Sequence, residues 1–255
     1  MPDFYAHHRF GKTVLPTLPA DVQQCITRFR RLFDAGLQGP DFFFYVNPLM
    51  KNPLGELGSQ FHDQTGREFF THAAAQAKTE AARAYLYGVL GHFCLDSVCH
   101  PFVNRKTQEG VCTHPALESE FDRYLMAADG IAEPHFHDAT VHMKVTRGEC
   151  VTMADFYPPA TPAQVNRGVR HMRWFLRFLV SRKREKHQKL VRLLDKSLLD
   201  VFIPASPVPE FQRLDSELLA RFNRAARDYP AMLQELMGHM RDEKEFGELF
   251  DVTFS

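Results

Sequence analysis

The stretch Tyr85–Arg105, "YLYGVLGHFCLDSVCHPFVNR", reads as an apolar helix that carries three polar groups on one stripe. His92, Asp96 and His100 recur at intervals of four, so on an α-helix they project from the same side. A carboxylate and two imidazoles left unpaired among apolar neighbours would cost several kcal/mol. They therefore need a partner. A divalent cation is one candidate, and a salt-bridged histidine and aspartate within the core is the other.

Further histidine and carboxylate groups occur in the first half of the chain. His114 and Glu118 are again four apart, at the start of a predicted helix. Single candidate ligands lie in three other segments: His7 and His8 in "AHHRFGK", Asp41 in "GPDFFFY" and His62 in "FHDQTG". Each of these alone is a weak signal. Two independent pairs with helical ligand spacing together indicate more than one metal ion.

The composition limits the class of protein. The chain has 255 residues, 44% of them hydrophobic, and a formal net charge of zero. That is enough for a sizeable core, and we expect no bulk electrostatic attraction to nucleic acid or to an anionic membrane. No stretch has the length of a membrane span, and the N-terminal residues lack the pattern of a secretory signal. The five cysteines form no CxxC pair. We expect a cytoplasmic protein with reduced thiols.

The hydrophobic periodicity favours an all-α fold, with little strand signal. We expect one helical domain over 1–255, with a metal-site half at 1–130 and a helical C-terminal half at 161–255. Residues 39–55 read as a connector, and 131–160 as an irregular segment with room for a short hairpin. The predicted helices are Pro19–Leu37, Thr65–Lys78 with Thr65 as N-cap, Thr79–Cys99 ended by Pro101, one from Pro115 to Asp129, Thr161–Leu199 with a break near Ser181, Ser216–Arg227 and Pro230–Phe246.

With these motifs the sequence resembles the bacterial zinc-dependent phospholipase C family, which is related in fold to the zinc S1/P1-type nucleases. The resemblance rests on four motifs in the first 125 residues or so. They are HxxxDxxxH at His92–His100, HxxxE at His114–Glu118, "FHD" at Phe61–Asp63 and "GPD" at Gly39–Asp41. It implies an all-helical fold and a trinuclear zinc cluster that hydrolyses phosphodiesters, and for this chain we expect two or three zinc ions.

The resemblance also implies a role for each matching residue. One zinc would be held by Asp41, His62, His92 and Asp96. Asp96 would bridge to a second zinc, which takes a histidine from the first helix, here His7 or His8, of which His7 sits in the register that resembles the family. A third would be held by His100, His114 and Glu118. His100 lies closer to Asp96 than its counterpart in the phospholipases does.

Two departures from the family pattern concern the second zinc and the substrate. The secreted phospholipases use an N-terminal tryptophan as a ligand, and here the only tryptophan is Trp174. Water, both His7 and His8, Asp3 or the chain terminus would complete the second site, or that ion is absent. The second departure concerns the substrate. No secretory leader is visible, which argues against extracellular phospholipid, the substrate of the secreted phospholipases.

The expected chemistry is hydrolysis of a phosphate ester, with a phospholipid head group as the first candidate. Paired zinc ions would neutralise the diester and activate water, and Asp41 would orient that water or take its proton. Phe42, Phe44 and Tyr45 follow directly and would form a wall for a head group, unless they belong to the core.

Three other functions stay open at this point. The protein could be a zinc nuclease or another phosphoesterase, although its neutral charge disfavours long nucleic acid. It could be a non-catalytic binding module whose helices are stabilised by a metal. An HD-type phosphohydrolase would use an adjacent His-Asp pair, at His62–Asp63 or His137–Asp138, but would leave His114 and Glu118 unexplained.

Overall fold

The computed structural model describes residues 4–46 and 52–254 and confirms the all-α class, with no strand in these two ranges. None of the helices in them is long and apolar enough to cross a membrane. The α-helices are α1 (Phe4–Val14), α2 (Ala20–Arg28), α3 (Arg30–Gly36), α4 (Pro53–Asp63), α5 (Gly66–Gln76), α6 (Glu80–Gln108), α7 (His114–Ala128), α8 (Arg147–Ala154), α9 (Pro162–Leu179), α10 (Arg184–Leu194) and α11 (Gln212–His239).

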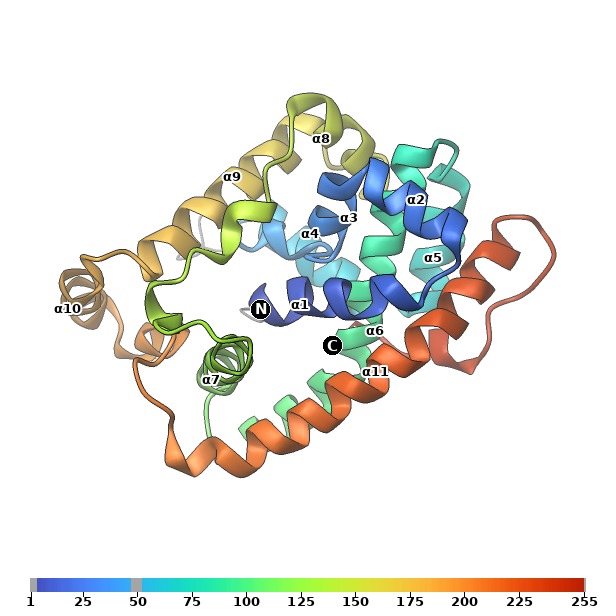
Figure 1. The fold of residues 1–255 in the computed structure, drawn as a ribbon. Helices are drawn as coiled ribbons and strands as arrows, with labels where there is room; N and C mark the ends of the chain where they lie inside the picture. Colours follow the sequence, from blue (N-terminus) through green and yellow to red (C-terminus); the bar gives the residue numbers. More distant parts are fainter. Residues whose placement is uncertain (1–3, 47–51, 255) are drawn as a thin grey trace.

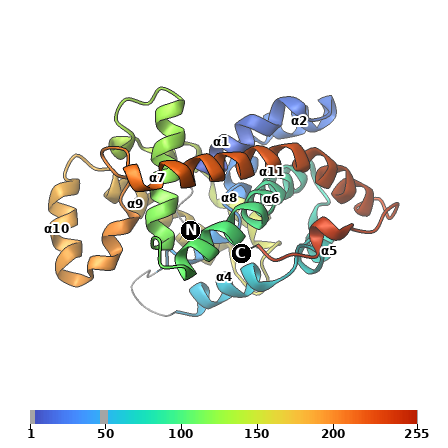
Figure 2. The same cartoon turned by 90° about the horizontal axis from the view of Figure 1, so that it is seen from below.

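Helix α6 is the central element. It is buried on all sides from Ala84 to Asp96, as expected for a helix that is apolar all round. Helices α3 and α11 form its most extensive contacts, and α1, α2, α5, α7 and α8 also pack on it (Figures 1 and 2). The approach of α3 is close, because a Cβ on Gly88 would collide with the Phe33 carbonyl oxygen. The stripe of His92, Asp96 and His100 therefore lies at the middle of the molecule.

Two predicted helix boundaries at prolines were wrong: the end of a helix at Pro101 and the start of a helix at Pro230. Pro101 lies inside α6, which continues to Gln108, and Pro230 lies inside α11. An internal proline costs a helix about 3 kcal/mol. Burial on both sides of each proline offsets that cost: Cys99 and Phe102 are buried around Pro101, and Tyr229 and Met232 around Pro230.

The N-terminal third also differs from the prediction. The single helix expected over Pro19–Leu37 is two helices that meet at Phe29, whose backbone leaves the helical region. The predicted connector contains the start of α4, which begins at Pro53 with Asn52 as N-cap. The Asn-Pro pair is a helix-start signal, because proline suits the first turn.

Other boundaries agree with the sequence. Thr65 caps α5 with Glu68 as its reciprocal partner, and Pro115 occupies the first turn of α7. The break predicted near Ser181 separates α9 from α10. The hairpin suggested for 131–160 was wrong: this segment holds two short 3₁₀ turns and α8, whose start is a capping box between Thr146 and Glu149.

Candidate metal centre

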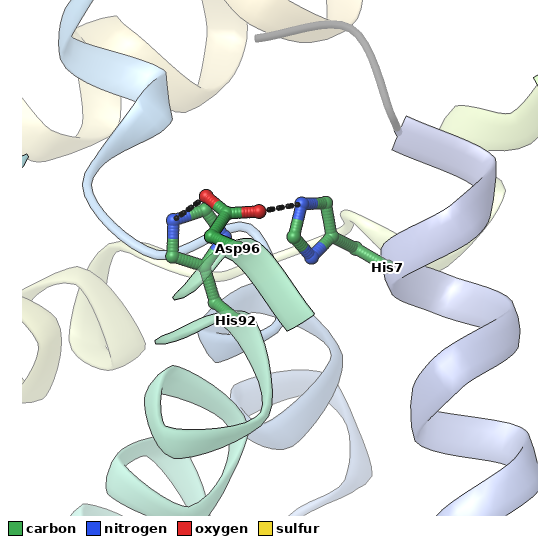
Figure 3. A group of neighbouring side chains, drawn as sticks. All are labelled: His7, His92 and Asp96. Carbon is green, nitrogen blue, oxygen red and sulfur yellow. Dashed lines mark ion pairs between the residues drawn. The ribbon is translucent and has the colours of Figure 1, made fainter. Parts of the chain in front are cut away.

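Asp96 is the centre of the histidine and carboxylate cluster. One carboxylate oxygen, Oδ2, lies 3.2 Å from Nε2 of His92 and 3.5 Å from Nε2 of His100, on either side of it along α6. The other, Oδ1, lies 3.2 Å from Nε2 of His7 on α1. Figure 3 shows His92 and His7 approaching opposite ends of the carboxylate. Asp96 is 3% exposed, so its contacts with the three imidazoles are buried.

A second group joins the 3₁₀ turn Asp41–Phe43 to α4. Nε2 of His62 lies 3.0 Å from a carboxylate oxygen of Asp41, and Nε2 of His92 lies 4.0 Å from the same oxygen. Nδ1 of His62 is 2.8 Å from the Gly58 carbonyl oxygen. A carbonyl only accepts, so Nδ1 donates to it, and Nε2 is the ring nitrogen that faces Asp41. Metal-ligating histidines are oriented in this way.

The third group lies where the C-terminal part of α6 faces the start of α7. Nε2 of His114 is 2.7 Å from Oε1 of Glu118, and Nε2 of His100 is 4.0 Å from the same oxygen. In each of the three groups the ligand atoms lie within 4.8 Å of one another. The groups are His7, His92 and Asp96; Asp41, His62 and His92; and His100, His114 and Glu118.

The donors fit a metal ion in chemistry as well as in position. Burial lowers the pKa of His92 to about 4, so the imidazole is neutral at pH 7. Burial raises the pKa of Asp96, but its imidazole neighbours, led by His92, outweigh burial and bring it well below the usual value. Ligands must be deprotonated to bind metal. Nε2 of His92 is also buried without a hydrogen bond to the described residues, which leaves a ligand atom unused.

Helix α1 is held in register by Asp122 of α7. Its two carboxylate oxygens accept hydrogen bonds of 2.9 Å from the backbone N–H groups of Tyr5 and Ala6. These are donors that the first turn of a helix leaves unsatisfied. Asp122 lies one helical turn beyond Glu118, so α7 contributes a candidate ligand and also positions His7.

His8 points away from the cluster. Its ring stacks on His142 with centroids 3.9 Å apart, and its Nδ1 lies 3.9 Å from Asp34. The structure therefore brings His7, and not His8, to Asp96. Asp3, the other N-terminal candidate, lies outside the described residues. His137 and Asp138 also lie outside the three groups, since Asp138 is bound to Thr140 and Arg177.

A cavity of about 450 Å³ opens onto the cluster. The residues around it are Asp41, Phe44, Ser59, His62, Asp63, His100, Asn104, His114, Pro115 and Glu118. Of the three aromatic residues predicted to contact substrate, only Phe44 lines it. Phe42 is fully buried against Phe43 and Tyr157, and Tyr45 is buried beside Phe175. The prediction for Phe42 and Tyr45 is thus corrected: their rings fill the core. Ser59, Asp63 and Asn104 are wall residues that the sequence reasoning missed.

Gly39 provides the space that His92 occupies. It has a φ of 47°, in the left-handed region that glycine adopts without strain. A Cβ at this position would collide with the His92 imidazole at Cδ2 and Nε2. The "GPD" motif therefore makes room for one candidate ligand, His92, and two residues later supplies another, Asp41.

We expect Gly39→Ala to reduce metal content and not merely stability. The new methyl group must displace His92, whose ring lies in a packed interior and cannot move without moving its candidate ion. Gly110→Ala is the matched control: Gly110 also has a positive φ, of 70°, but its Cβ would meet nothing within 4 Å. Both variants should lose about 1 kcal/mol of stability from backbone strain. Metal analysis should show a loss only for Gly39→Ala. Equal metal content in the two variants would contradict this role.

The fold and the site together define a helical protein with a buried, multi-ligand candidate metal centre. The family model described as zinc-dependent phospholipase C matches residues 6–158, more than half of the chain. The chain therefore belongs to the zinc-dependent phospholipase C family, as the resemblance predicted. The match includes all eight predicted metal ligands. No curated protein and no solved structure matches the chain. Membership supports a zinc-dependent, phospholipase C-like hydrolase.

Proposed function

We propose that the protein is a zinc-dependent phosphodiesterase that cleaves a phospholipid at its head group. The observation that carries the proposal is that two of the three ligand groups lie at one cavity, and the third shares His92 with one of them. Five of the eight predicted ligands line the cavity, and the other three, His7, His92 and Asp96, make up the third group. A salt-bridged core, the alternative open from the sequence, does not explain why three imidazoles, those of His62, His100 and His114, gather at a cavity wall.

The residues that would hold zinc follow from the ligand groups. Asp41, His62, His92 and Asp96 would hold one ion, and His100, His114 and Glu118 another. Asp96 would bridge from the first to a further ion near His7, because its two oxygens face histidines of different helices. Zinc bound here would neutralise the charge of a phosphodiester and make water a better nucleophile at neutral pH.

The proton transfer is assigned to Asp41. Its carboxylate lines the cavity, and its pKa is about 2, because the imidazoles of His92 and His62 outweigh the effect of burial. It is ionised at pH 7 and can orient a water molecule or accept its proton. The 3.0 Å contact with His62 keeps this carboxylate turned toward the ligand groups.

The proposed substrate class rests on family membership and on the walls of the cavity. Phe44 supplies an apolar surface, and the exposed carboxylate of Asp63 lies at the rim. Among the lining residues there is no lysine or arginine that would follow a nucleic-acid backbone. A phospholipid head group therefore fits this cavity better than a polynucleotide.

The test is a panel of substrates presented to zinc-loaded protein. We expect hydrolysis of p-nitrophenyl phosphorylcholine and of phospholipid vesicles, with little turnover of p-nitrophenyl phosphate or single-stranded DNA. A chelator should abolish the activity, and zinc should restore it. Preferential cleavage of DNA would indicate a nuclease. Full zinc content without any hydrolysis would indicate a binding module, and either result would overturn the proposal.

A further inference from the structure

The segment that contains helices α9 and α10 has a large net positive charge, although the chain as a whole is neutral. From Pro162 to Leu194 there are ten arginines and lysines and a single acidic residue, Glu185, which gives a net charge of +9 in a chain whose total is zero. Six of these cations are exposed and have no ion pair within the described part of the chain. They are Arg167, Arg170, Lys183, Lys186, Lys189 and Arg192.

The same two helices carry the two most exposed large apolar side chains of the described residues, and a third that is more than half exposed. Leu193 is 84% exposed, Trp174 is 66% exposed and Leu190 is 54% exposed. Leu190 and Leu193 alternate with Lys186 and Lys189 at helical spacings of three and four, so they share one face of α10. Apolar and cationic side chains are thus mixed on a single surface.

The apolar side chains of α9 and α10 connect across the break between the helices. The ring of Trp174 lies 5.8 Å from that of Phe178, which stacks on His187 of α10 at 3.8 Å. Nδ1 of His187 also lies 2.8 Å from the Phe178 carbonyl oxygen. His187 is one turn before Leu190. The basic and apolar face of α9 and α10, which we call the α9–α10 surface, is therefore continuous.

The α9–α10 surface is attached near the rim of the cavity. The 3₁₀ segment Lys196–Val201 follows α10 directly and packs on α7. Within it, Asp200 accepts a 2.7 Å hydrogen bond from Thr113, the N-cap residue immediately before His114. Figure 2 shows α10 at the edge of the molecule, on the side of α7 and α9. Helix α10 is thus connected, through the segment Lys196–Val201, to helix α7, which supplies His114 and Glu118.

We propose that the α9–α10 surface docks the protein on an anionic lipid bilayer. Cations would meet the lipid phosphates, while Trp174 and the two leucines enter the boundary between head groups and acyl chains. Charge complementarity alone would also suit a nucleic acid, but a leucine that is 84% exposed gains nothing from a phosphate backbone. The inference deepens the proposed function by adding the membrane on which the substrate lies, and its test measures binding alone.

Trp174 is the only tryptophan of the chain, so its fluorescence reports directly on this surface. Zinc-loaded protein is mixed with vesicles of phosphatidylcholine alone or with about 30% phosphatidylserine. We expect a blue shift and co-sedimentation with the anionic vesicles only, both weakened by salt. The same result with Asp41→Asn, whose α9–α10 surface is unchanged, would show that docking does not need hydrolysis. Docking then stands even if the substrate panel overturns the proposed function.

Variants distinguish docking through the α9–α10 surface from nonspecific binding to vesicles. Lys186→Gln with Lys189→Gln should weaken vesicle binding by about 30-fold, at about 1 kcal/mol for each cation. Leu190→Ser with Leu193→Ser should remove the blue shift. The matched control, Arg213→Gln with Arg224→Gln on α11, removes the same charge from another face and should bind as the wild type does. Equal weakening by the control pair would overturn the proposal, as would binding to duplex DNA with no binding to anionic vesicles.

Discussion

Replacing Asp96 with asparagine is expected to remove metal and hydrolysis together. Asp96 presents one oxygen to His92 and His100 and the other to His7, so it is shared by two of the proposed ion sites. Asparagine offers one neutral oxygen in the same volume and cannot replace both contacts. Loss of a metal ligand costs more than the 10- to 100-fold in affinity that supporting contacts provide, so we expect activity to fall by at least about 10³-fold.

The measurement for Asp96→Asn is zinc content, followed by thermal unfolding with and without added zinc. The wild type should be stabilised by zinc because binding is coupled to folding, and the variant should respond weakly. Asp34→Asn is the control: Asp34 is also a buried aspartate, but it pairs with Arg30 outside the cluster. If Asp96→Asn unfolds more easily but keeps the zinc content of the wild type, Asp96 is a salt-bridged core residue.

His7→Ala is expected to remove one ion and leave the others in place. His7 is the one ligand that α1 contributes to the described cluster, and its ion shares Asp96 with the neighbouring site. An ion held by fewer protein groups should dissociate first. We therefore expect two classes of zinc: a tight pair on Asp41, His62, His92, Asp96, His100, His114 and Glu118, and a looser ion near His7.

A mild chelator distinguishes these classes. In the wild type, hydrolysis should fall when the loose ion is stripped and recover when zinc is added. His7→Ala should start at the lower rate, by about 10- to 100-fold, and should not recover. His8→Ala is the matched control, because its side chain stacks on His142 away from Asp96. Full metal content and full activity in His7→Ala would mean that the centre is dinuclear.

The parts of the site that depend on local spacing could be predicted from the sequence. The spacing of four places His92, Asp96 and His100 on one side of a helix, and the same holds for His114 and Glu118. Local capping signals also located the starts of α5 and α7. Helical geometry alone determines these features, so no knowledge of tertiary contacts was needed.

The parts that depend on packing between distant segments could not be predicted. The resemblance favoured His7 over His8, but the contact that positions α1 comes from Asp122 on another helix and has no local signal. Phe254 packs its ring 5.9 Å from the rings of both His62 and His92, and no local pattern relates it to them. Pro101 was predicted to end one helix and Pro230 to begin another, because local propensity carries no information about the buried contacts that keep α6 and α11 intact.

Zinc stoichiometry tests the central claim most directly. Protein purified without a metal-affinity tag would be loaded with zinc, dialysed extensively and measured by mass spectrometry together with protein concentration. The three ligand groups predict at least two zinc ions per chain, with a third that dialysis or a mild chelator removes first. Retention of less than one equivalent would contradict the account, because the buried histidines and carboxylates around Asp96 would then pair only with one another.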